Sequence, residues 1–173
     1  HNEAQCFKSA FPKFKLNVIN NEDGFNEILI GFVEGTTHGF DNKYDGYILK
    51  SSADLALYTK LVNDDGHDYA IQAIPPLTKE LTVKLGLLAG LEGIYSFNAT
   101  SIENFNDTVS IFLEDLYEDY TVNLRTTASY NFTVDETGTY NDRFLIKFGS
   151  SGVGIEEGES FASRFHVYCH EGI

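Results

Sequence analysis

The feature that most constrains the fold is an alternation of apolar with other residues, which recurs in segment after segment along the chain. In Lys13-Phe14-Lys15-Leu16-Asn17-Val18, the apolar side chains occupy every second position. Successive side chains of a β-strand point to opposite faces, so this period of two predicts a strand with one face in the core. The same pattern occurs at Ile28, Ile30 and Phe32; at Val83, Leu85 and Leu87; at Tyr95, Phe97 and Ala99; at Val109, Ile111 and Leu113; at Tyr130, Phe132 and Val134; and at Phe144, Ile146 and Phe148. This repetition predicts an all-β fold, an antiparallel β-sandwich of the jelly-roll kind with about 8 to 10 strands.

Turn-forming residues separate these segments, at residues 20–24, 63–66, 89–90 and 137–138. Pro75-Pro76 is expected to end a strand or to lie at a sheet edge. Residues 52–61 are interpreted as a short strand, with a helical turn as the alternative. The predicted organisation is an N-terminal segment (1–10), a β-sandwich domain (11–148), a flexible acidic linker (149–163) and the start of a truncated C-terminal β domain (164–173).

The net charge of the chain restricts which classes of molecule it can bind. The chain has 173 residues, a formal net charge of -14 and a pI near 4.5. Such a surface repels phosphate-rich ligands, so binding of nucleic acid or of an anionic membrane is disfavoured, whereas divalent cations would be attracted. No apolar run approaches the roughly 18 residues that a membrane span needs, so no membrane insertion is expected. The two cysteines, Cys6 and Cys169, lie near opposite ends and could form a disulfide or remain free thiols.

Several separated motifs carry a resemblance to a known family. They are Gly31-Phe32-Val33-Glu34-Gly35-Thr36-Thr37-His38-Gly39-Phe40-Asp41-Asn42-Lys43-Tyr44-Asp45, Ala70-Ile71, Pro75, Leu113-Glu114-Asp115 and Asp142-Arg143-Phe144. In this order they resemble a β-sandwich module of Bacteroidetes surface proteins, which is located just before the C-terminal sorting domain of type IX secretion substrates. The resemblance covers residues 11–148, and Phe165-His166-Val167-Tyr168 is similar to the opening strand of such a sorting domain.

This resemblance implies an extracellular or cell-surface protein exported by type IX secretion, with the secretion machinery as a partner of the C-terminal tail. It does not by itself imply any particular activity, because such modules are attached to many different proteins, and fold does not specify function. We therefore expect a non-catalytic module that acts as a spacer, adhesion or accessory domain next to the sorting signal.

A loop with three carboxylates, Glu34, Asp41 and Asp45, is the candidate metal site. Ca²⁺ prefers six to eight oxygen ligands, which carboxylates and amides could partly supply here. The spacing departs from that of an EF-hand, and Lys43 lies within it. The alternative is structural: the aspartates form local turn hydrogen bonds that hold the loop on the domain. No cofactor is predicted apart from the Ca²⁺ of the metal alternative.

Tyrosines at predicted turns and strand ends are the candidate carbohydrate-binding residues. Sugar-binding sandwiches stack sugar rings on exposed aromatic side chains, although this chain has no tryptophan. A surface glycan is therefore a candidate partner, with partly buried packing residues as the alternative role of these tyrosines. The five residues are Tyr44, Tyr47, Tyr117, Tyr120 and Tyr140.

The remaining polar motifs are weaker. Glu114-Asp115 with Glu118-Asp119 could be interpreted as a glycosidase pair, but that mechanism needs two carboxylates facing each other across a cleft. A charge-assisted bond from Arg143 to Glu114 or Asp115 is the more natural use, so no catalytic residue is predicted. Residues 63–68, with three aspartates, are expected to form a turn. Asp107-Thr108-Val109 resembles the O-glycosylation motif of exported proteins in this phylum, which makes Thr108 a candidate modification site.

Overall fold

The computed structural model describes residues 10–50 and 54–149, and within these two stretches the chain is built from strands and loops without a helix. The strands are β1 (Lys13–Asn20), β2 (Phe25–Phe32), β3 (Gly46–Tyr47), β4 (Leu55–Thr59), β5 (Tyr69–Ile74), β6 (Leu81–Ala89), β7 (Gly93–Glu103), β8 (Ile111–Asp115), β9 (Tyr120–Asn123), β10 (Ser129–Val134) and β11 (Gly138–Phe148). The predicted all-β fold is confirmed. The interpretation of residues 52–61 as a strand is confirmed by β4, and Pro75 directly follows β5, as expected.

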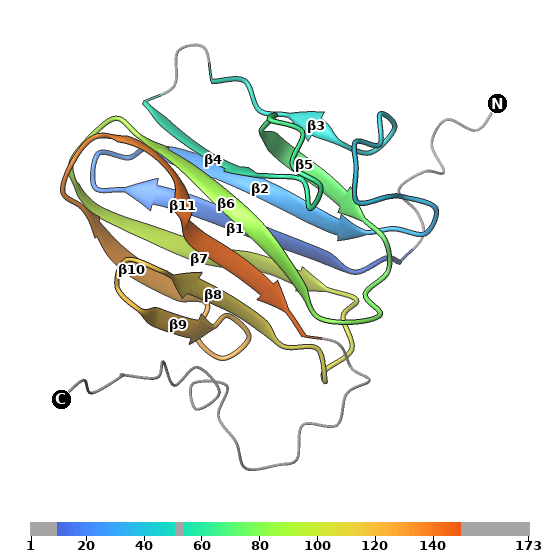
Figure 1. The fold of residues 1–173 in the computed structure, drawn as a ribbon. Coiled ribbons are helices and arrows are strands. Elements are labelled where there is room, and N and C mark those ends of the chain that lie inside the picture. Colours follow the sequence, from blue (N-terminus) through green and yellow to red (C-terminus); the bar gives the residue numbers. More distant parts are fainter. Residues whose placement is uncertain (1–9, 51–53, 150–173) are drawn as a thin grey trace, which may run out of the picture.

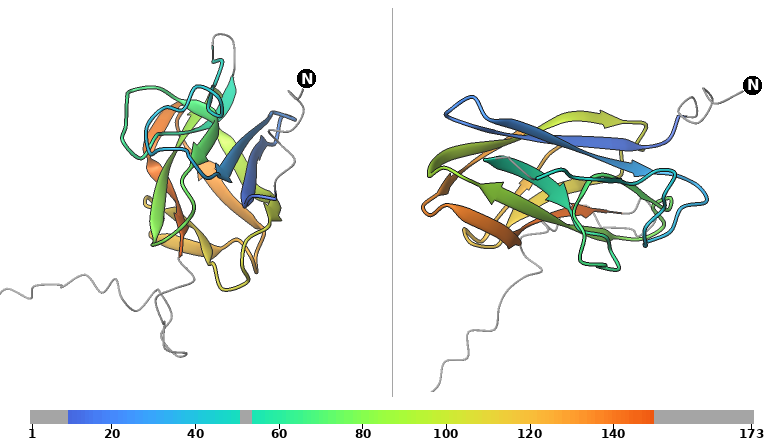
Figure 2. Two further views of the ribbon diagram at one scale, coloured as in Figure 1. Left: turned by 90° about the vertical axis from the view of Figure 1, so that its right-hand side faces the viewer. Right: turned by 90° about the horizontal axis from the view of Figure 1, so that it is seen from above.

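All strands belong to one sheet, which folds over on itself. The order is β10-β7-β1-β2-β5-β4-β6-β11-β8-β9, with β3 pairing with β5 off this path. β10, β7, β1 and β2 form one layer, and β4, β6, β11 and β8 face them from the other (Figures 1 and 2). The two ends of the path return to each other, because the rings of Tyr120 in β9 and Tyr130 in β10 stack with their centroids 5.5 Å apart. The result is a flattened, nearly closed barrel.

The sheet is mixed, which corrects the prediction of a purely antiparallel sandwich. The parallel pair is β2 with β5, in which Leu29 lies opposite Ile71 and Phe32 lies opposite Ile74. A parallel pair requires a long crossover connection, and residues 33–68 provide it, contributing β3 and β4 on the way. The alternation pattern could not reveal this, because it reports which face of a strand is buried and says nothing about its neighbour.

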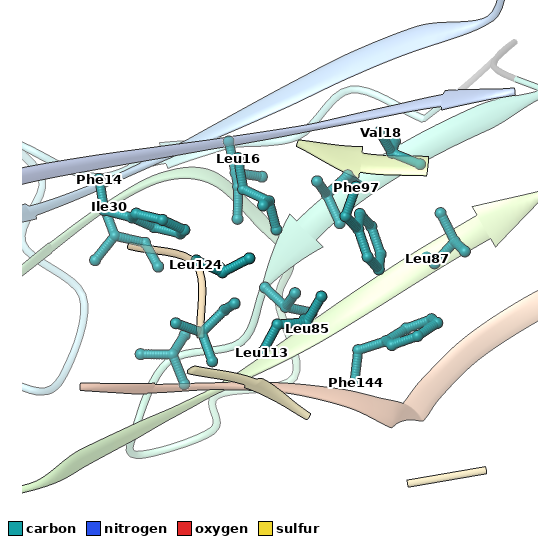
Figure 3. Packing of buried hydrophobic residues seen from close by; sticks show 14 of the residues in the cluster. Phe14, Leu16, Val18, Ile30, Leu85, Leu87, Phe97, Leu113, Leu124 and Phe144 are labelled. Carbon is teal, nitrogen blue, oxygen red and sulfur yellow. The ribbon is translucent and has the colours of Figure 1, made fainter. Parts of the chain in front are cut away.

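The core lies between the two layers and is lined by the alternating side chains (Figure 3). Phe14, Leu16 and Val18 of β1 are fully buried, and Leu85 of β6 packs in the same cluster from the opposite layer. Of the predicted inward residues, Ala99 and Tyr130 are only partly buried, and the others are buried. Burying an aliphatic or aromatic side chain contributes about 1.5–3 kcal/mol, so this inward set drives the fold.

One tyrosine packs on the outer surface of the sheet instead. Tyr58 of β4 lies on Gly86 of β6, where a Cβ atom would come 1.9 Å from the Tyr58 ring. The Tyr58 hydroxyl donates a hydrogen bond to Asn141 Oδ1 at 2.8 Å, and the Lys50 ammonium lies 3.5 Å from the ring centroid. Glycine is therefore required at position 86 by close packing rather than by backbone conformation.

Candidate functional site

Four tyrosines gather where the two ends of the sheet meet, on the β8–β9 hairpin, β10 and β11. We call Tyr117, Tyr120, Tyr130 and Tyr140 the tyrosine platform. Tyr117 and Tyr120 are 63% and 52% exposed, whereas Tyr130 and Tyr140 are partly buried. The platform thus has two exposed rings that rest on a partly buried layer.

The local sequence explains how the hairpin presents these rings. Ile111, Leu113 and Asp115 are the inward residues of β8, so the strand ends with a buried carboxylate. That carboxylate accepts hydrogen bonds from the backbone N–H groups of Tyr117 at 3.0 Å and Glu118 at 3.4 Å. Such side-chain bonds to the next residues of the backbone are typical of aspartate at a turn. The buried Asp115 carboxylate therefore holds the conformation of the turn that carries Tyr117 and leads into Tyr120.

A buried ion pair lies under the platform. Arg143 of β11 and Asp115 are 3% and 1% exposed. Arg143 donates from Nε to Asp115 Oδ1 at 3.0 Å and from Nη2 to Oδ2 at 2.8 Å. This two-point geometry is the strong form of a charge-assisted hydrogen bond. It confirms the prediction that Arg143 would bind a carboxylate of β8.

The same pair joins the two ends of the sheet. Arg143 Nη1 donates to the Thr133 carbonyl of β10 at 3.0 Å, and the Tyr130 hydroxyl of β10 donates to Asp115 Oδ2 at 3.0 Å. An edge strand with unpaired backbone groups is open to pairing with another chain. These side-chain bonds provide a donor for the Thr133 carbonyl of the edge strand β10. They also connect β10 to β8 and β11, with which it forms no backbone hydrogen bonds in the sheet.

Burial and the ion pair both affect ionisation here. Burial opposes the charge of the Arg143 guanidinium, but hydrogen bonds to Asp115 and attraction to its charge outweigh this and raise the pKa of Arg143. Burial, together with the hydrogen bond to Asp115, raises the pKa of Tyr130 well above its ordinary value. The platform therefore has neutral Tyr130 and a charged, compensated Arg143 beneath it at all physiological pH values.

The rings are arranged in two pairs. The Arg143 guanidinium carbon lies 5.1 Å from the centroid of Tyr117 and 5.9 Å from that of Tyr140, and these two rings meet edge to face at 67°. Tyr120 instead stacks on Tyr130 with an interplanar angle of 14°. Each exposed tyrosine thus rests on a partly buried one, Tyr117 edge to face on Tyr140 and Tyr120 face to face on Tyr130.

The structure brings together three of the five predicted ligand tyrosines and separates the other two. Tyr117, Tyr120 and Tyr140 meet in the platform, whereas Tyr44 lies in the loop before β3 and Tyr47 is in β3 itself. Tyr44 is half-buried, and Tyr47, 48% exposed, stacks on Phe40 with centroids 5.1 Å apart.

The predicted metal loop is held by its own hydrogen bonds. Asp41 Oδ2 accepts from the backbone N–H of Thr37 at 2.6 Å. Asp45 accepts from the N–H of Asp41 at 2.7 Å and, through its other oxygen, from the N–H of Ala73 in β5 at 2.7 Å. Burial is the main cause that raises the pKa of Asp45. Glu34 is exposed, and within residues 10–50 and 54–149 no three metal-ligating side chains are grouped together. The geometry corresponds to the structural alternative, in which the aspartates hold the loop on β5.

The remaining polar residues singled out from the sequence are not part of the tyrosine platform. Glu114, on the opposite face of β8 from Asp115, forms an ion pair with Lys147 of β11. Thr108 is exposed in the turn between β7 and β8, and its hydroxyl donates to Asn106 Oδ1 at 2.9 Å, so its modification stays a prediction. Residues 63–68 form the expected turn, in which Asp64 accepts from the Gly66 N–H at 2.9 Å.

The predicted acidic linker from residue 150 onward, the final segment, Cys6 and Cys169 lie outside the described residues. Tyr130 is the member of the platform that the sequence does not reveal, because alternation predicts its side chain in the core. Its partial burial follows from its position on an end strand, which the sequence pattern does not report.

In the part of the chain that the structure describes, no helix is long and apolar enough to cross a membrane. A search of curated proteins and a search of solved structures each found no match. The sequence does match a family described as a domain of unknown function (DUF8693), over residues 2–148. Because this match extends over most of the 173 residues, the chain belongs to the DUF8693 family.

Proposed function

We propose that this chain is a non-catalytic extracellular module of a secreted or cell-surface bacterial protein, and that it acts in adhesion by binding carbohydrate through the tyrosine platform. The observation that carries the proposal is the pair of exposed rings, Tyr117 and Tyr120, held in place by the buried Asp115–Arg143 pair. Grouped exposed aromatic side chains mark binding sites more often than single ones do, and a rigid support for them lowers the entropy lost when a ligand binds.

The chemistry of the platform suits a sugar. A tyrosine ring offers an apolar face to the C–H groups of a sugar ring and a hydroxyl to its polar edge. Tyrosine also loses little conformational entropy on binding, because it has only two side-chain torsions. Glu118 lies between the two exposed tyrosines in sequence and supplies a carboxylate that can accept hydrogen bonds from sugar hydroxyls.

Two of the four carboxylates that could suggest hydrolysis, Glu114 and Asp115, have structural partners instead. Asp115 is buried against Arg143, and Glu114 pairs with Lys147. These contacts support an accessory module rather than a glycosidase. The extracellular location and export by type IX secretion rest on the resemblance of residues 11–148 to modules next to a sorting domain.

The test is retention of the purified chain on a panel of insoluble and surface polysaccharides, with Ca²⁺ and again with a chelator. We expect retention that is lost in Tyr117→Ala and Tyr120→Ala and kept in Tyr47→Ala, which removes an exposed tyrosine elsewhere on the domain. Circular dichroism of each variant verifies that the fold is intact. Equal retention of all variants would contradict the assignment to the platform, and no retention on any glycan would leave the chain a spacer.

A further inference from the structure

We infer that the carbohydrate bound by the tyrosine platform carries amino groups, that is, a polysaccharide of cationic amino sugars. This inference rests on the proposed function and adds the chemical class of the ligand. It follows from the charges that surround the exposed rings, from the compensation of Arg143, and from the charge of the whole chain.

Two carboxylates lie in the turn that joins the exposed tyrosines. Glu118 and Asp119 follow Tyr117 and precede Tyr120, and both are exposed. The Glu118 side chain is 63% exposed, with one oxygen 3.8 Å from Arg143 Nη2. Asp119 has φ of 49°, in the left-handed region, and is the last residue of the turn before β9. A ligand that contacts both exposed rings therefore lies beside both carboxylates.

The cation beneath the platform does not neutralise this rim. Arg143 is 3% exposed, and its guanidinium is already bound to both oxygens of Asp115 and to the Thr133 carbonyl. Its single positive charge is shared between the closely bound Asp115 and the more distant Glu118, at 2.8 Å and 3.8 Å from Nη2, so Asp115, Glu118 and Asp119 together leave an excess of negative charge at the rim. Tyr140, whose ring centroid lies 6.1 Å from that of Tyr117, donates its hydroxyl to the backbone carbonyl of Glu136, a further exposed acidic residue.

An ammonium group fits this surface in two ways. It is attracted to the negative face of a tyrosine ring, a contact that contributes about 0.5–1 kcal/mol at exposed sites. It also forms charge-assisted hydrogen bonds with a carboxylate. The net charge of -14 repels sulfated or uronic acid polymers over the whole surface, so the acidic class of glycan is disfavoured.

The experiment compares two soluble oligosaccharide series with the same β-1,4 backbone, one of glucosamine and one of N-acetylglucosamine, at physiological ionic strength. Affinity is measured by calorimetry, and the site is located from the NMR signals of the tyrosine rings. We expect the glucosamine series to bind at least tenfold more tightly. Binding should weaken roughly five- to tenfold in the double variant Glu118→Gln/Asp119→Asn, since each exposed ion pair contributes at most about 1 kcal/mol. Asparagine tolerates the left-handed backbone of residue 119, so that variant should fold normally.

Non-specific attraction of an acidic protein to a cation needs its own control. The variant Tyr117→Ala/Tyr120→Ala keeps the net charge, so undiminished binding of glucosamine oligomers to it would overturn the inference. Equal affinity for both series would also overturn it while leaving carbohydrate binding in place. No binding of any glycan would refute the proposed function itself. Tyrosine-dependent binding of oligolysine as tight as that of glucosamine oligomers would reassign the platform to a basic peptide.

Discussion

Replacing Asp115, the buried carboxylate beneath the tyrosine platform, is the most direct test of how the two ends of the sheet are held together. Asp115→Asn keeps the size of the side chain and one carbonyl oxygen. That oxygen can still accept the N–H groups of Tyr117 and Glu118, which bond to Asp115 Oδ1. The change therefore removes mainly the negative charge and the bonds to Oδ2, from Arg143 Nη2 at 2.8 Å and from the Tyr130 hydroxyl at 3.0 Å.

The expected loss is large because the Arg143 guanidinium is buried. The Arg143 side chain is 4% exposed and that of Asp115 is 0% exposed, so the variant removes the close counter-ion and leaves only the exposed Glu118, 3.8 Å from Nη2. Breaking a buried ion pair from one side costs about 3–5 kcal/mol. The neighbouring change Glu114→Gln affects a more exposed pair with Lys147 and should cost about 1 kcal/mol or less.

Equilibrium unfolding in urea measures both changes, with tyrosine fluorescence as the probe because the chain has no tryptophan. Adding Arg143→Met to Asp115→Asn removes the unpaired charge and should restore part of the loss. Our reasoning would be refuted by an Asp115→Asn variant that unfolds at the same urea concentration as Glu114→Gln, with an unchanged slope. It would fail equally if the Arg143→Met addition made the loss greater.

Two further predictions concern the outer surface of the sheet. Gly86→Ala should lower the free energy of unfolding by about 1–3 kcal/mol, because its Cβ would overlap the Tyr58 ring. The matched control is Gly138→Ala, because position 138 has open space around it. Equal thermal unfolding temperatures of the two variants would contradict the packing argument. Burial, the main cause, raises the pKa of Tyr58 from 10.0 to about 12. A group with a raised pKa contributes stability that is present below its unfolded value and is lost as pH rises toward its folded value. The free energy of unfolding should therefore decline between pH 10 and about pH 12, and Tyr58→Phe should reduce that decline. If Tyr58→Phe and the unmodified chain show the same decline, Tyr58 does not cause it.

The sequence could predict what depends on local periodicity. Alternation correctly predicts the inward residues of β1, β2, β6 and β11. In a strand, residues i and i+2 point to the same face, so the sequence alone shows which side chains share a face. β3, with two residues, and β9, with four, are too short for alternation to reveal, which is why the structure has more strands than expected. The loop with Asp41 and Asp45 was recognised as a structural or metal-binding loop, but only its contact with Ala73 distinguishes the two geometrically.

Local residue patterns are enough to predict the all-β class, the buried face of the long strands and the turns between them, since each of these depends on residues only a few positions apart. The parallel pairing of β2 with β5, the return of β9 to β10 and the grouping of three among the five candidate tyrosines depend instead on long-range packing. Asp115 and Arg143 are 28 residues apart, and they meet because β8 and β11 are neighbours in the sheet. No local pattern records that neighbourhood, because it is set by how the whole inward surface packs into a single core.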